Sequence, residues 1–277
     1  MITTPRIQVD LGKIQHNTRY LVERLKARGI TVTAVTKATC GHPKIAQAML
    51  DGGAVDLGEA RITNVKRLRR AGITTPITLI RTPILSQADR VVRSCSTSYN
   101  SEIEVIARLA EAARKAKLVH HIMLMVEMGD MRDGIMPENV AAIARQVAAM
   151  PGVKLRGIGA NFACLSGMAP DAAKMKDLST IASDTERAHG SLIRVISGGN
   201  SANLPWALGA HSSTRINNLR LGEAILLGVE PVSGDKISGL FTDAFTLVTE
   251  VIEAKVKPVP AKVKFTNCLL YTSDAAD

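Results

Sequence analysis

Short strand-like runs alternate with helix-like segments along most of this chain, and that alternation limits the folds open to it. The run at 31–37, Thr-Val-Thr-Ala-Val-Thr-Lys, is rich in β-branched residues, as buried strands are, and a helical pattern follows it. Eight such runs occur within about 230 residues, the usual size of a (β/α)8 barrel. They cover residues 31–37, 55–57, 76–80, 94–98, 118–127, 154–160, 192–197 and 224–227. No Gly-x-Gly-x-x-Gly turn supports a dinucleotide-binding open sheet. The sequence therefore predicts an α/β fold, a (β/α)8 TIM barrel.

Residues that favour helix starts mark several of the segments between these runs. Asp10 is placed to cap a helix, and Pro43 and Pro137 each stand at a first helical position. Ser101 with Glu104 matches the capping-box pattern. We expect these helices to cover the outside of the barrel.

The pattern changes after the barrel-like part. Residues 245–253 alternate between apolar and polar side chains without a helix after them, which predicts the opening strand of a β-rich second domain. We therefore divide the chain into a barrel domain at 1–233, an incomplete β-rich domain at 234–267 and a tail at 268–277. The tail resembles a translated sequencing adapter, so we expect it to be non-native and the protein to be truncated at its C-terminus.

Composition and charge narrow the class of protein. Lys and Arg outnumber Asp and Glu by 35 to 25, a net charge of +10 that raises the question of nucleic acid. The densest basic cluster, at 66–70, is interrupted by a leucine, as on the solvent face of an amphipathic helix. Aromatic residues make up only 3% of the chain, too few to form platforms for stacked bases. We therefore expect no nucleic-acid partner.

The expected location is the cytoplasm. No apolar run is long enough to span a membrane, and the N-terminal residues lack the pattern of a secretory signal. The four cysteines are scattered without a Cys-x-x-Cys pair, which argues against a disulfide framework and a zinc site. His120 and His121 are neighbours on a predicted strand and point to opposite faces, so they cannot share an ion. We expect no metal site and no membrane partner.

Lys37 ends the first strand-like run, and Gly41 and Pro43 follow it closely. The carboxyl ends of strands are where barrel enzymes place their chemistry. A lysine enclosed there by apolar side chains would have a lowered amine pKa and would react readily with carbonyl groups. The alternative from this stretch alone is a solvated lysine that opens a loop.

The segment Val35-Thr36-Lys37-Ala38, followed by Gly41-His42, resembles the cofactor-binding lysine segment of alanine-racemase-like enzymes. The resemblance is greatest to the alanine/ornithine racemase branch, of the alanine racemase N-terminal domain type (fold type III), and runs from Pro5 to about Lys264. It implies pyridoxal 5'-phosphate as the cofactor and Lys37 as the catalytic lysine that binds it covalently.

Two glycine-containing turns supply the expected phosphate site of that cofactor. Residues 197–201, Ser-Gly-Gly-Asn-Ser, follow the seventh run, and their backbone N–H groups and the Ser201 hydroxyl can bind phosphate. Residues 220–224 fall at the expected eighth strand, where Gly222 and Glu223 would add backbone N–H groups. The resemblance assigns Arg220 to the pyridine nitrogen, where a permanently charged arginine keeps that nitrogen unprotonated and favours racemisation.

Two further positions follow from the resemblance. Arg132, in the segment from Glu127 to Gly134, would be the second catalytic residue, close to the phenolic oxygen of the cofactor or to the substrate carboxylate. Asn161 would contact the cofactor where alanine racemases carry a histidine that stacks on the ring. That departure puts strict alanine specificity in doubt. Cys40 stands where alanine racemases carry a phosphate-binding tyrosine, and it either contacts the cofactor or only packs.

The family implies an amino acid racemase that interconverts the L- and D-forms of alanine, ornithine or a similar amino acid, as a homodimer when full-length. A pyridoxal phosphate carrier without catalytic activity remains an alternative, because the segment at 58–61 also resembles one in the single-domain proteins of that class. An aldolase or a decarboxylase of the same barrel type is a further alternative. Racemisation needs a base on each face of the substrate, and none of Tyr20, Tyr99 and Tyr271 is a credible second base. We expect the truncated chain to bind the cofactor but to turn over slowly.

Overall fold

The computed structural model describes residues 4–164, 167–209 and 214–256. The chain divides into two compact units, a large one from Val9 to Thr246 and a small one that combines the residues before and after it. The strands β1 (Arg6–Val9) and β10 (Phe245–Val248) pair as a two-stranded sheet. No helix in the described part of the chain is both long and apolar enough to cross a membrane.

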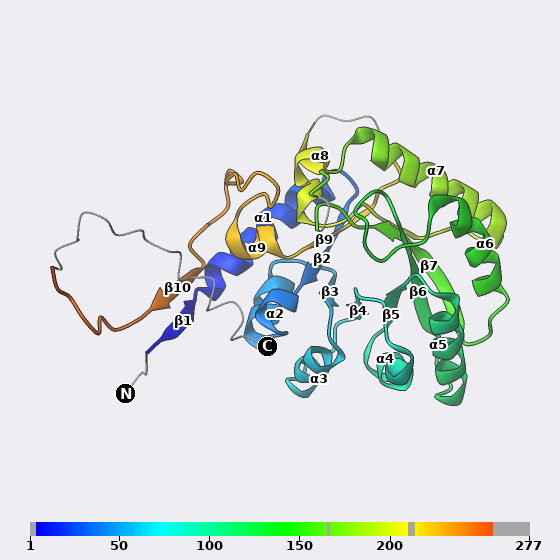
Figure 1. Cartoon of the computed structure of the whole chain (residues 1–277), viewed down its shortest axis with the longest axis horizontal. Helices are drawn as coiled ribbons and strands as arrows, with labels where there is room; N and C mark the ends of the chain where they lie inside the picture. The colour runs from blue at the N-terminus through cyan, green and yellow to red at the C-terminus, as the bar shows by residue number, and fades with distance from the viewer. Residues whose placement is uncertain (1–3, 165–166, 210–213, 257–277) are drawn as a thin grey trace, which may run out of the picture. The chain divides into compact units, whose positions relative to one another are not determined.

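The large unit is a closed barrel of eight parallel strands (Figure 1). Its strands are β2 (Thr31–Val35), β3 (Asp56–Glu59), β4 (Ile77–Leu79), β5 (Thr97–Asn100), β6 (His120–Val126), β7 (Val153–Ala160), β8 (Val195–Ser197) and β9 (Asn218–Leu221). Strand β9 pairs in parallel with β2, with Thr33 opposite Arg220, and this pairing closes the barrel. The predicted fold, a (β/α)8 barrel followed by β structure, is confirmed.

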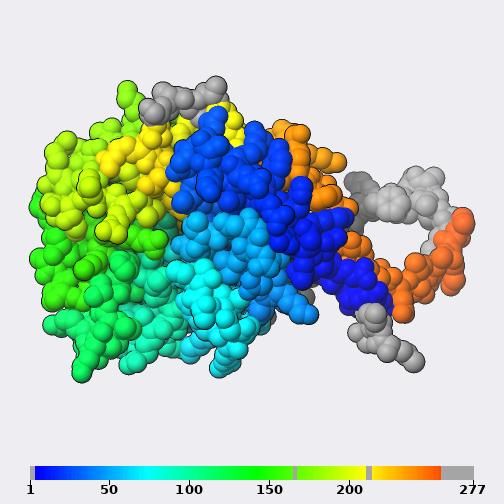
Figure 2. Space-filling view, turned by 180° about the vertical axis from the view of Figure 1, so that it is seen from behind, coloured from blue at the N-terminus to red at the C-terminus, as the bar shows by residue number. Residues whose placement is uncertain are grey.

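Helices surround the barrel and cover its outer face (Figure 1). They are α1 (Leu11–Lys26), α2 (Pro43–Asp51), α3 (Ile62–Arg70), α4 (Ala88–Ser94), α5 (Ile103–Lys115), α6 (Pro137–Ala148), α7 (Ala172–His189), α8 (Leu204–Leu208) and α9 (Glu223–Leu227). The described residues also form single turns of 3-10 helix, namely η1 (Lys37–Thr39), η2 (Leu85–Gln87) and η3 (Ser201–Asn203). Figure 2 shows α1 in blue on the side of the barrel, beside α8 in yellow.

Several helix starts follow the sequence rules closely. The Asp10 carboxylate accepts a hydrogen bond from the Lys13 backbone N–H at 3.0 Å and caps α1, and prolines open α2 and α6 as predicted. The predicted capping box at Ser101 is wrong. Helix α5 begins after Glu102, without a side-chain cap, and the Ser101 hydroxyl lies 3.4 Å from that of Thr82.

The last predicted strand is also misplaced. Residues 224–227 lie in helix α9, whereas the eighth barrel strand is β9, a few residues earlier. Its alternate residues Leu219 and Leu221 are buried in the main apolar core, while Asn218 and Arg220 line a cavity inside the barrel. Strand β9 therefore lacks a continuous apolar run because its inward side is polar.

The barrel interior combines a small apolar cluster with a polar layer. Tyr99, Met123 and Met125 form the apolar cluster. Next to it, inside the barrel, lies a partly open cavity of about 50 Å³, whose lining includes Thr33, Asp56 and other polar side chains. Most barrel interiors are filled by branched apolar residues, so a polar layer of this kind requires a hydrogen-bonding arrangement of its own.

Candidate functional site

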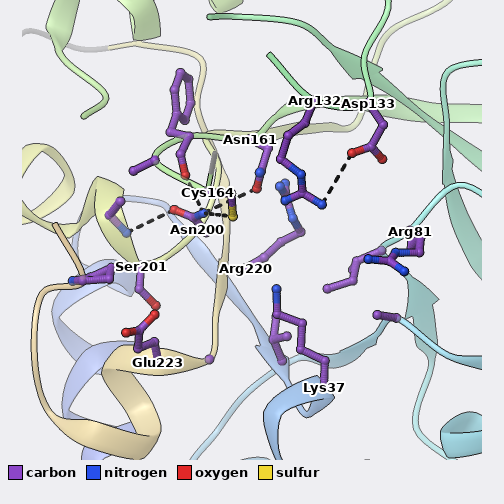
Figure 3. Close-up of a pocket in the computed structure, with 18 of the residues that line it drawn as sticks. Lys37, Arg81, Arg132, Asp133, Asn161, Cys164, Asn200, Ser201, Arg220 and Glu223 are labelled. Carbon is purple, nitrogen blue, oxygen red and sulfur yellow. Dashed lines mark hydrogen bonds and ion pairs between the residues drawn. The ribbon is translucent and has the colours of Figure 1, made fainter. Parts of the chain in front are cut away.

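A cavity of about 160 Å³ lies at the carboxyl ends of the barrel strands. Seven residues singled out from the sequence line it: Lys37, Arg132, Asn161, Ser201, Arg220, Gly222 and Glu223. Figure 3 shows Lys37, Arg132 and Arg220 directed toward one shared space, with Ser201 and Glu223 on one side and Arg81 on the other. The topology brings together residues that are far apart in the chain because parallel strands present all their carboxyl ends at one face.

Lys37 directly follows a firmly held piece of backbone. The Thr36 N–H donates to the Gly58 carbonyl at 3.0 Å, and the Thr36 hydroxyl donates to Glu59 Oε2 at 2.9 Å. Glu59 is fully buried, and its Oε1 also accepts from the Ala60 N–H and from Asn64. The Lys37 side chain itself is exposed, so the expected enclosure by apolar side chains is not formed by the described residues. The backbone is fixed while the amine stays accessible to a ligand.

The expected phosphate end of the cavity is formed by η3 and the start of α9. The Ser201 hydroxyl accepts a hydrogen bond from the Ala224 N–H at 3.3 Å, which leaves its own hydrogen available to a ligand. The first N–H groups of a helix have no partner within it. A Cβ atom at Gly222 would lie 3.1 Å from both Cβ and O of Val35, so a side chain there would press on strand β2. Glycine at 222 therefore allows the backbone to approach a bound group closely.

Arg220 is buried beneath the centre of the cavity. Its Nη1 donates to the Ser197 hydroxyl at 2.8 Å and to the Tyr99 hydroxyl at 3.2 Å, and its Nη2 donates to the Ala160 carbonyl at 2.7 Å. The guanidinium carbon also lies 4.7 Å from the centre of the Tyr99 ring. All of these acceptors are neutral, although a buried charge usually has a charged partner. The guanidinium can thus take a further acceptor from a molecule bound in the cavity.

Arg132 lies on a loop held by one carboxylate. Glu127 Oε1 accepts from the backbone N–H groups of Gly129 at 2.6 Å and Met131 at 3.1 Å, and Oε2 accepts from that of Arg132 at 3.2 Å. The Arg132 guanidinium lies 3.7 Å from Asp133, which also lines the cavity. The loop therefore has a defined shape before any ligand is bound.

Asn161 joins two loops at the rim of the cavity. Its amide nitrogen donates to Asp130 at 2.8 Å, and its oxygen accepts from Asn200 at 3.4 Å. Asn200 also donates to the Phe162 carbonyl at 2.8 Å and to the Cys164 sulfur at 3.6 Å. Asn161 thus lines the cavity with its polar atoms engaged by these loops.

Sequence reasoning missed several residues of the cavity, among them Arg81, Asp133, Cys164 and Asn200. Arg81 lies in no recognisable chemical motif and follows a strand, which is its one local signal, whereas Asn200 lies within the predicted turn at 197–201 but was given no role of its own. The lining contains four cationic side chains, Lys37, Arg81, Arg132 and Arg220, against the carboxylates of Asp133 and Glu223. This excess of positive charge suits a ligand that carries phosphate and carboxylate groups.

The two adjacent histidines lie in different surroundings. His120 is buried, with Nε2 2.9 Å from the Ser98 hydroxyl, and burial lowers its pKa to about 4. His121 is partly exposed, and burial again lowers its pKa, with a further contribution from the nearby charge of Arg156. Among the described residues, no group of three or more His, Cys, Asp or Glu side chains could hold a metal ion.

Comparison with known protein families identifies the family to which this barrel and its cavity belong. The family model for the alanine racemase N-terminal domain matches residues 9–231, which contain the whole cavity. The chain belongs to the alanine racemase N-terminal domain family. The family resemblance inferred from the lysine segment is confirmed.

Curated relatives of this alanine racemase-type barrel include racemases for three amino acids. A lysine racemase from Thermotoga maritima is 35% identical, with 92% of this chain and 71% of that protein covered. An ornithine racemase from Acetoanaerobium sticklandii is 30% identical, with 92% and 72% covered. An alanine racemase from Treponema pallidum is 26% identical, with 93% and 69% covered.

Solved structures share the fold of this alanine racemase-type barrel at lower identity. An alanine racemase from Streptomyces lavendulae matches with a TM-score of 0.69 and 24% identity, over 83% of this chain and 61% of its own. A D-threonine aldolase from Filomicrobium marinum matches with a TM-score of 0.70 and 15% identity, over 86% and 66%. The chain therefore spans about three fifths to two thirds of the length of these proteins.

Proposed function

We propose that this chain is the barrel part of a pyridoxal 5'-phosphate-dependent amino acid racemase. The observation that carries the proposal is the meeting of three features at one cavity: the accessible amine of Lys37, the buried guanidinium of Arg220 and the cradle of Ser201 and Gly222. These features match three needs of the cofactor: an amine for the covalent bond, a donor to the ring nitrogen and donors to the phosphate. The closeness of Gly222 to Val35 supports the fit, since a side chain there would collide with strand β2 and displace the backbone of the cradle.

Each residue has a role that follows from its surroundings. Bound pyridoxal phosphate would withdraw electrons from the α-carbon of the amino acid and so stabilise negative charge there. Arg220 orients the ring and, as a permanent cation, donates to its nitrogen without giving up a proton. Glu223 and Gly222 offer backbone N–H groups to the phosphate, and Asn161 borders the ring. Lys37 accepts and returns the α-proton on one face of the substrate.

Arg132 is proposed to bind the carboxylate of the substrate or the phenolic oxygen of the cofactor, because its planar fork suits either group. Arg81 is close enough to the cavity to share in binding the carboxylate. No tyrosine or histidine is among the described residues that line the cavity, so the base for the second face is not a tyrosine or a histidine of this lining. Tyr99 is buried against Arg220 and lines the cavity inside the barrel, which fits the expectation that it is not this base.

The proposed substrate is a small or basic amino acid. Relatives named as lysine, ornithine and alanine racemases support this class without choosing within it. The homodimer, the cytoplasmic location and the division into domains at residue 233 stay predictions. Cys268 to Asp277 and Tyr271 lie outside the described residues.

Borohydride reduction after incubation with pyridoxal 5'-phosphate tests the role of Lys37. We expect a stable covalent label on the wild-type protein and its loss in Lys37→Ala. Lys44→Ala is the matched control, because Lys44 is an exposed lysine near the start of helix α2. An unchanged label in Lys37→Ala would mean that another amine holds the cofactor.

Chiral chromatography of a panel of L-amino acids, including lysine, ornithine, alanine and serine, tests the reaction. The appearance of the D-form is the expected result. Carbon dioxide release or aldehyde formation without racemisation would instead indicate a decarboxylase or an aldolase. The full-length enzyme is the protein to assay, since slow turnover is expected of the truncated chain; binding of the cofactor by the full-length enzyme with no conversion of any of these amino acids would favour a carrier.

A further inference from the structure

Glu59 and Thr36 lie side by side beneath the backbone that carries Lys37. Glu59 is the last residue of strand β3, and Thr36 directly follows the neighbouring strand β2. Both are fully buried, and neither is among the described residues that line the candidate site. A buried carboxyl group is costly unless hydrogen bonds replace the water that it has lost. The partners of Glu59 therefore indicate what this side chain holds in place.

Glu59 accepts hydrogen bonds from two separate segments. Its Oε2 atom accepts from the Thr36 hydroxyl at 2.9 Å. Its Oε1 atom accepts from the Ala60 backbone N–H at 2.7 Å and from the Asn64 amide nitrogen at 3.2 Å. Asn64 lies in the first turn of helix α3. One carboxyl group thus joins the residue before Lys37 to the start of a helix.

Thr36 also closes the turn on which Lys37 lies. Its carbonyl accepts from the backbone N–H groups of Thr39 and Gly41, each at 3.1 Å. Its own N–H donates to the Gly58 carbonyl on strand β3 at 3.0 Å. The turn from Lys37 to Gly41 is therefore closed by hydrogen bonds to a single residue, and the side chain of that residue is bound by the carboxyl group from β3.

Helix α3 contacts the far end of the same turn. Arg67 Nη1 donates to the Cys40 carbonyl at 3.0 Å. Gly41 has a φ of +61°, and a Cβ atom there would lie 2.9 Å from Cβ of Asn64, closer than such atoms normally approach. The turn and the helix are thus in direct contact, so a movement of one requires a movement of the other.

We propose that Glu59 is a positioning residue for Lys37 and acts through Thr36. Glu59 holds the Thr36 side chain and so fixes the point from which the lysine side chain enters the candidate site. The covalent bond depends on this position. In that bond the Lys37 nitrogen replaces the aldehyde oxygen of pyridoxal 5'-phosphate, which leaves as water with the two hydrogens of the neutral amine. This consequence rests on the proposed function, whereas the geometry of the turn does not.

Amide hydrogen exchange in the turn tests the proposal without a ligand. The full chain is labelled with ¹⁵N, and the amides of Thr39 and Gly41 are followed because both donate to Thr36. We expect Thr36→Val and Glu59→Gln each to speed their exchange about tenfold, as the loss of a hydrogen bond to a charged group would. Thr36→Ser keeps the hydroxyl, so its exchange should stay within about twofold of the wild type.

Thr18→Val is the matched control. Thr18 is fully buried in helix α1, and its hydroxyl donates to the Ile14 carbonyl at 2.8 Å. This variant also loses a buried hydroxyl, but from a helix that contributes no described residue to the lining of the site. It should leave the exchange of the two turn amides unchanged. Equal effects of Thr18→Val and Thr36→Val, or equal effects of Thr36→Val and Thr36→Ser, would overturn the proposal.

Glu59→Gln exchanging like the wild type at both amides would also overturn it. If Glu59→Gln does not fold, the comparison of Thr36→Val with Thr36→Ser and Thr18→Val decides the outcome, since it removes the same bond from the other side.

Two related ligands separate the covalent bond from the other contacts of the cofactor. Pyridoxine 5'-phosphate has an alcohol in place of the aldehyde, so it can occupy the same site without bonding to Lys37. We expect Thr36→Val and Glu59→Gln to weaken binding of pyridoxal 5'-phosphate about tenfold in calorimetry, and that of pyridoxine 5'-phosphate by less than about twofold. Equal losses for the two ligands would mean general damage to the site and would overturn the proposal.

The wild-type protein distinguishes a failure of this inference from a failure of the proposed function. Wild-type protein that does not bind pyridoxal 5'-phosphate would refute the proposed function, and the exchange result would still stand. Wild-type protein that binds it covalently, with exchange and affinity unaffected by Thr36→Val and Glu59→Gln, would refute only this inference.

Discussion

Acid should destabilise this protein through one buried imidazole, that of His120. The residue begins strand β6, is 1% exposed and bonds Ser98 through Nε2. Burial, with a smaller contribution from neighbouring His121, lowers its pKa from 6.5 to about 4. The folded protein therefore keeps His120 neutral at pH values where the unfolded chain would bind a proton.

The sign and the size of the effect follow from linkage. Between pH 6.5 and 4 the unfolded state binds more protons at this residue, so the stabilisation is complete above pH 6.5 and is lost as the pH falls. A difference of one pKa unit corresponds to ~1.4 kcal/mol, so the loss amounts to about 2 kcal/mol at pH 5 and about 3 kcal/mol at pH 4. That is a large part of the 5–15 kcal/mol by which a typical domain is stable, by the usual order-of-magnitude figures.

Urea unfolding at several pH values between 7 and 4.5 measures this loss, with the fluorescence of Trp206, the single tryptophan, as the probe. The comparison protein is His120→Gln, which can keep the bond to Ser98 but does not titrate. Asp56 and His121 titrate in both proteins, so their contributions largely cancel in the difference. We expect the wild type to lose about 2 kcal/mol more than the variant on going from pH 7 to pH 5. A difference that stays constant within about 0.5 kcal/mol would refute the reasoning.

Three other substitutions test the site. Gly222→Ala should weaken pyridoxal phosphate binding about tenfold in an absorbance titration, because the added Cβ meets Val35 at 3.1 Å, and an unchanged affinity would contradict the close approach. Glu59→Gln should lower the free energy of unfolding by about 2–4 kcal/mol, since a buried carboxylate that accepts several hydrogen bonds is replaced, and a loss below about 1 kcal/mol would argue against that role. Arg132→Lys keeps the charge but loses the planar fork, so KM should rise about tenfold with kcat little changed. The reverse pattern in steady-state kinetics would place Arg132 in the chemical step.

The sequence was sufficient to predict the barrel, and the site residues that it singled out line one cavity. Strands such as 31–37 carry their own local signal, and the closure of eight strands follows from their number and spacing. Once Lys37 and Arg220 are assigned to strand ends, the topology places them at one face without further information. The same reasoning predicts that Ser201 and Gly222, more than twenty residues apart in the chain, lie at one site, and both line the cavity.

The failures have physical causes that a single sequence does not reveal. The eighth strand was placed a few residues too late in the chain because Asn218 and Arg220 face a polar interior, so the segment lacks the apolar run by which strands are recognised. The capping box failed because the Ser101 hydroxyl lies next to Thr82, a residue from the preceding strand-to-helix connection. Asn200 was part of the predicted turn at 197–201, but its own role was not foreseen, because its partners belong to the loop after strand β7 and contacts of that range are decided only by the fold.

The Glu127 carboxylate has a consequence for ligand binding that goes beyond its three hydrogen bonds. Ordering a free loop around a ligand reduces the conformational entropy of the loop, and that loss weakens affinity. Glu127 shifts most of this loss to folding, because the backbone from Gly129 to Arg132 is already tied to it. When a carboxylate binds, only the Arg132 side chain then loses conformational freedom, because the backbone of the loop is already fixed. Selectivity among amino acids can therefore depend on a residue that does not line the cavity.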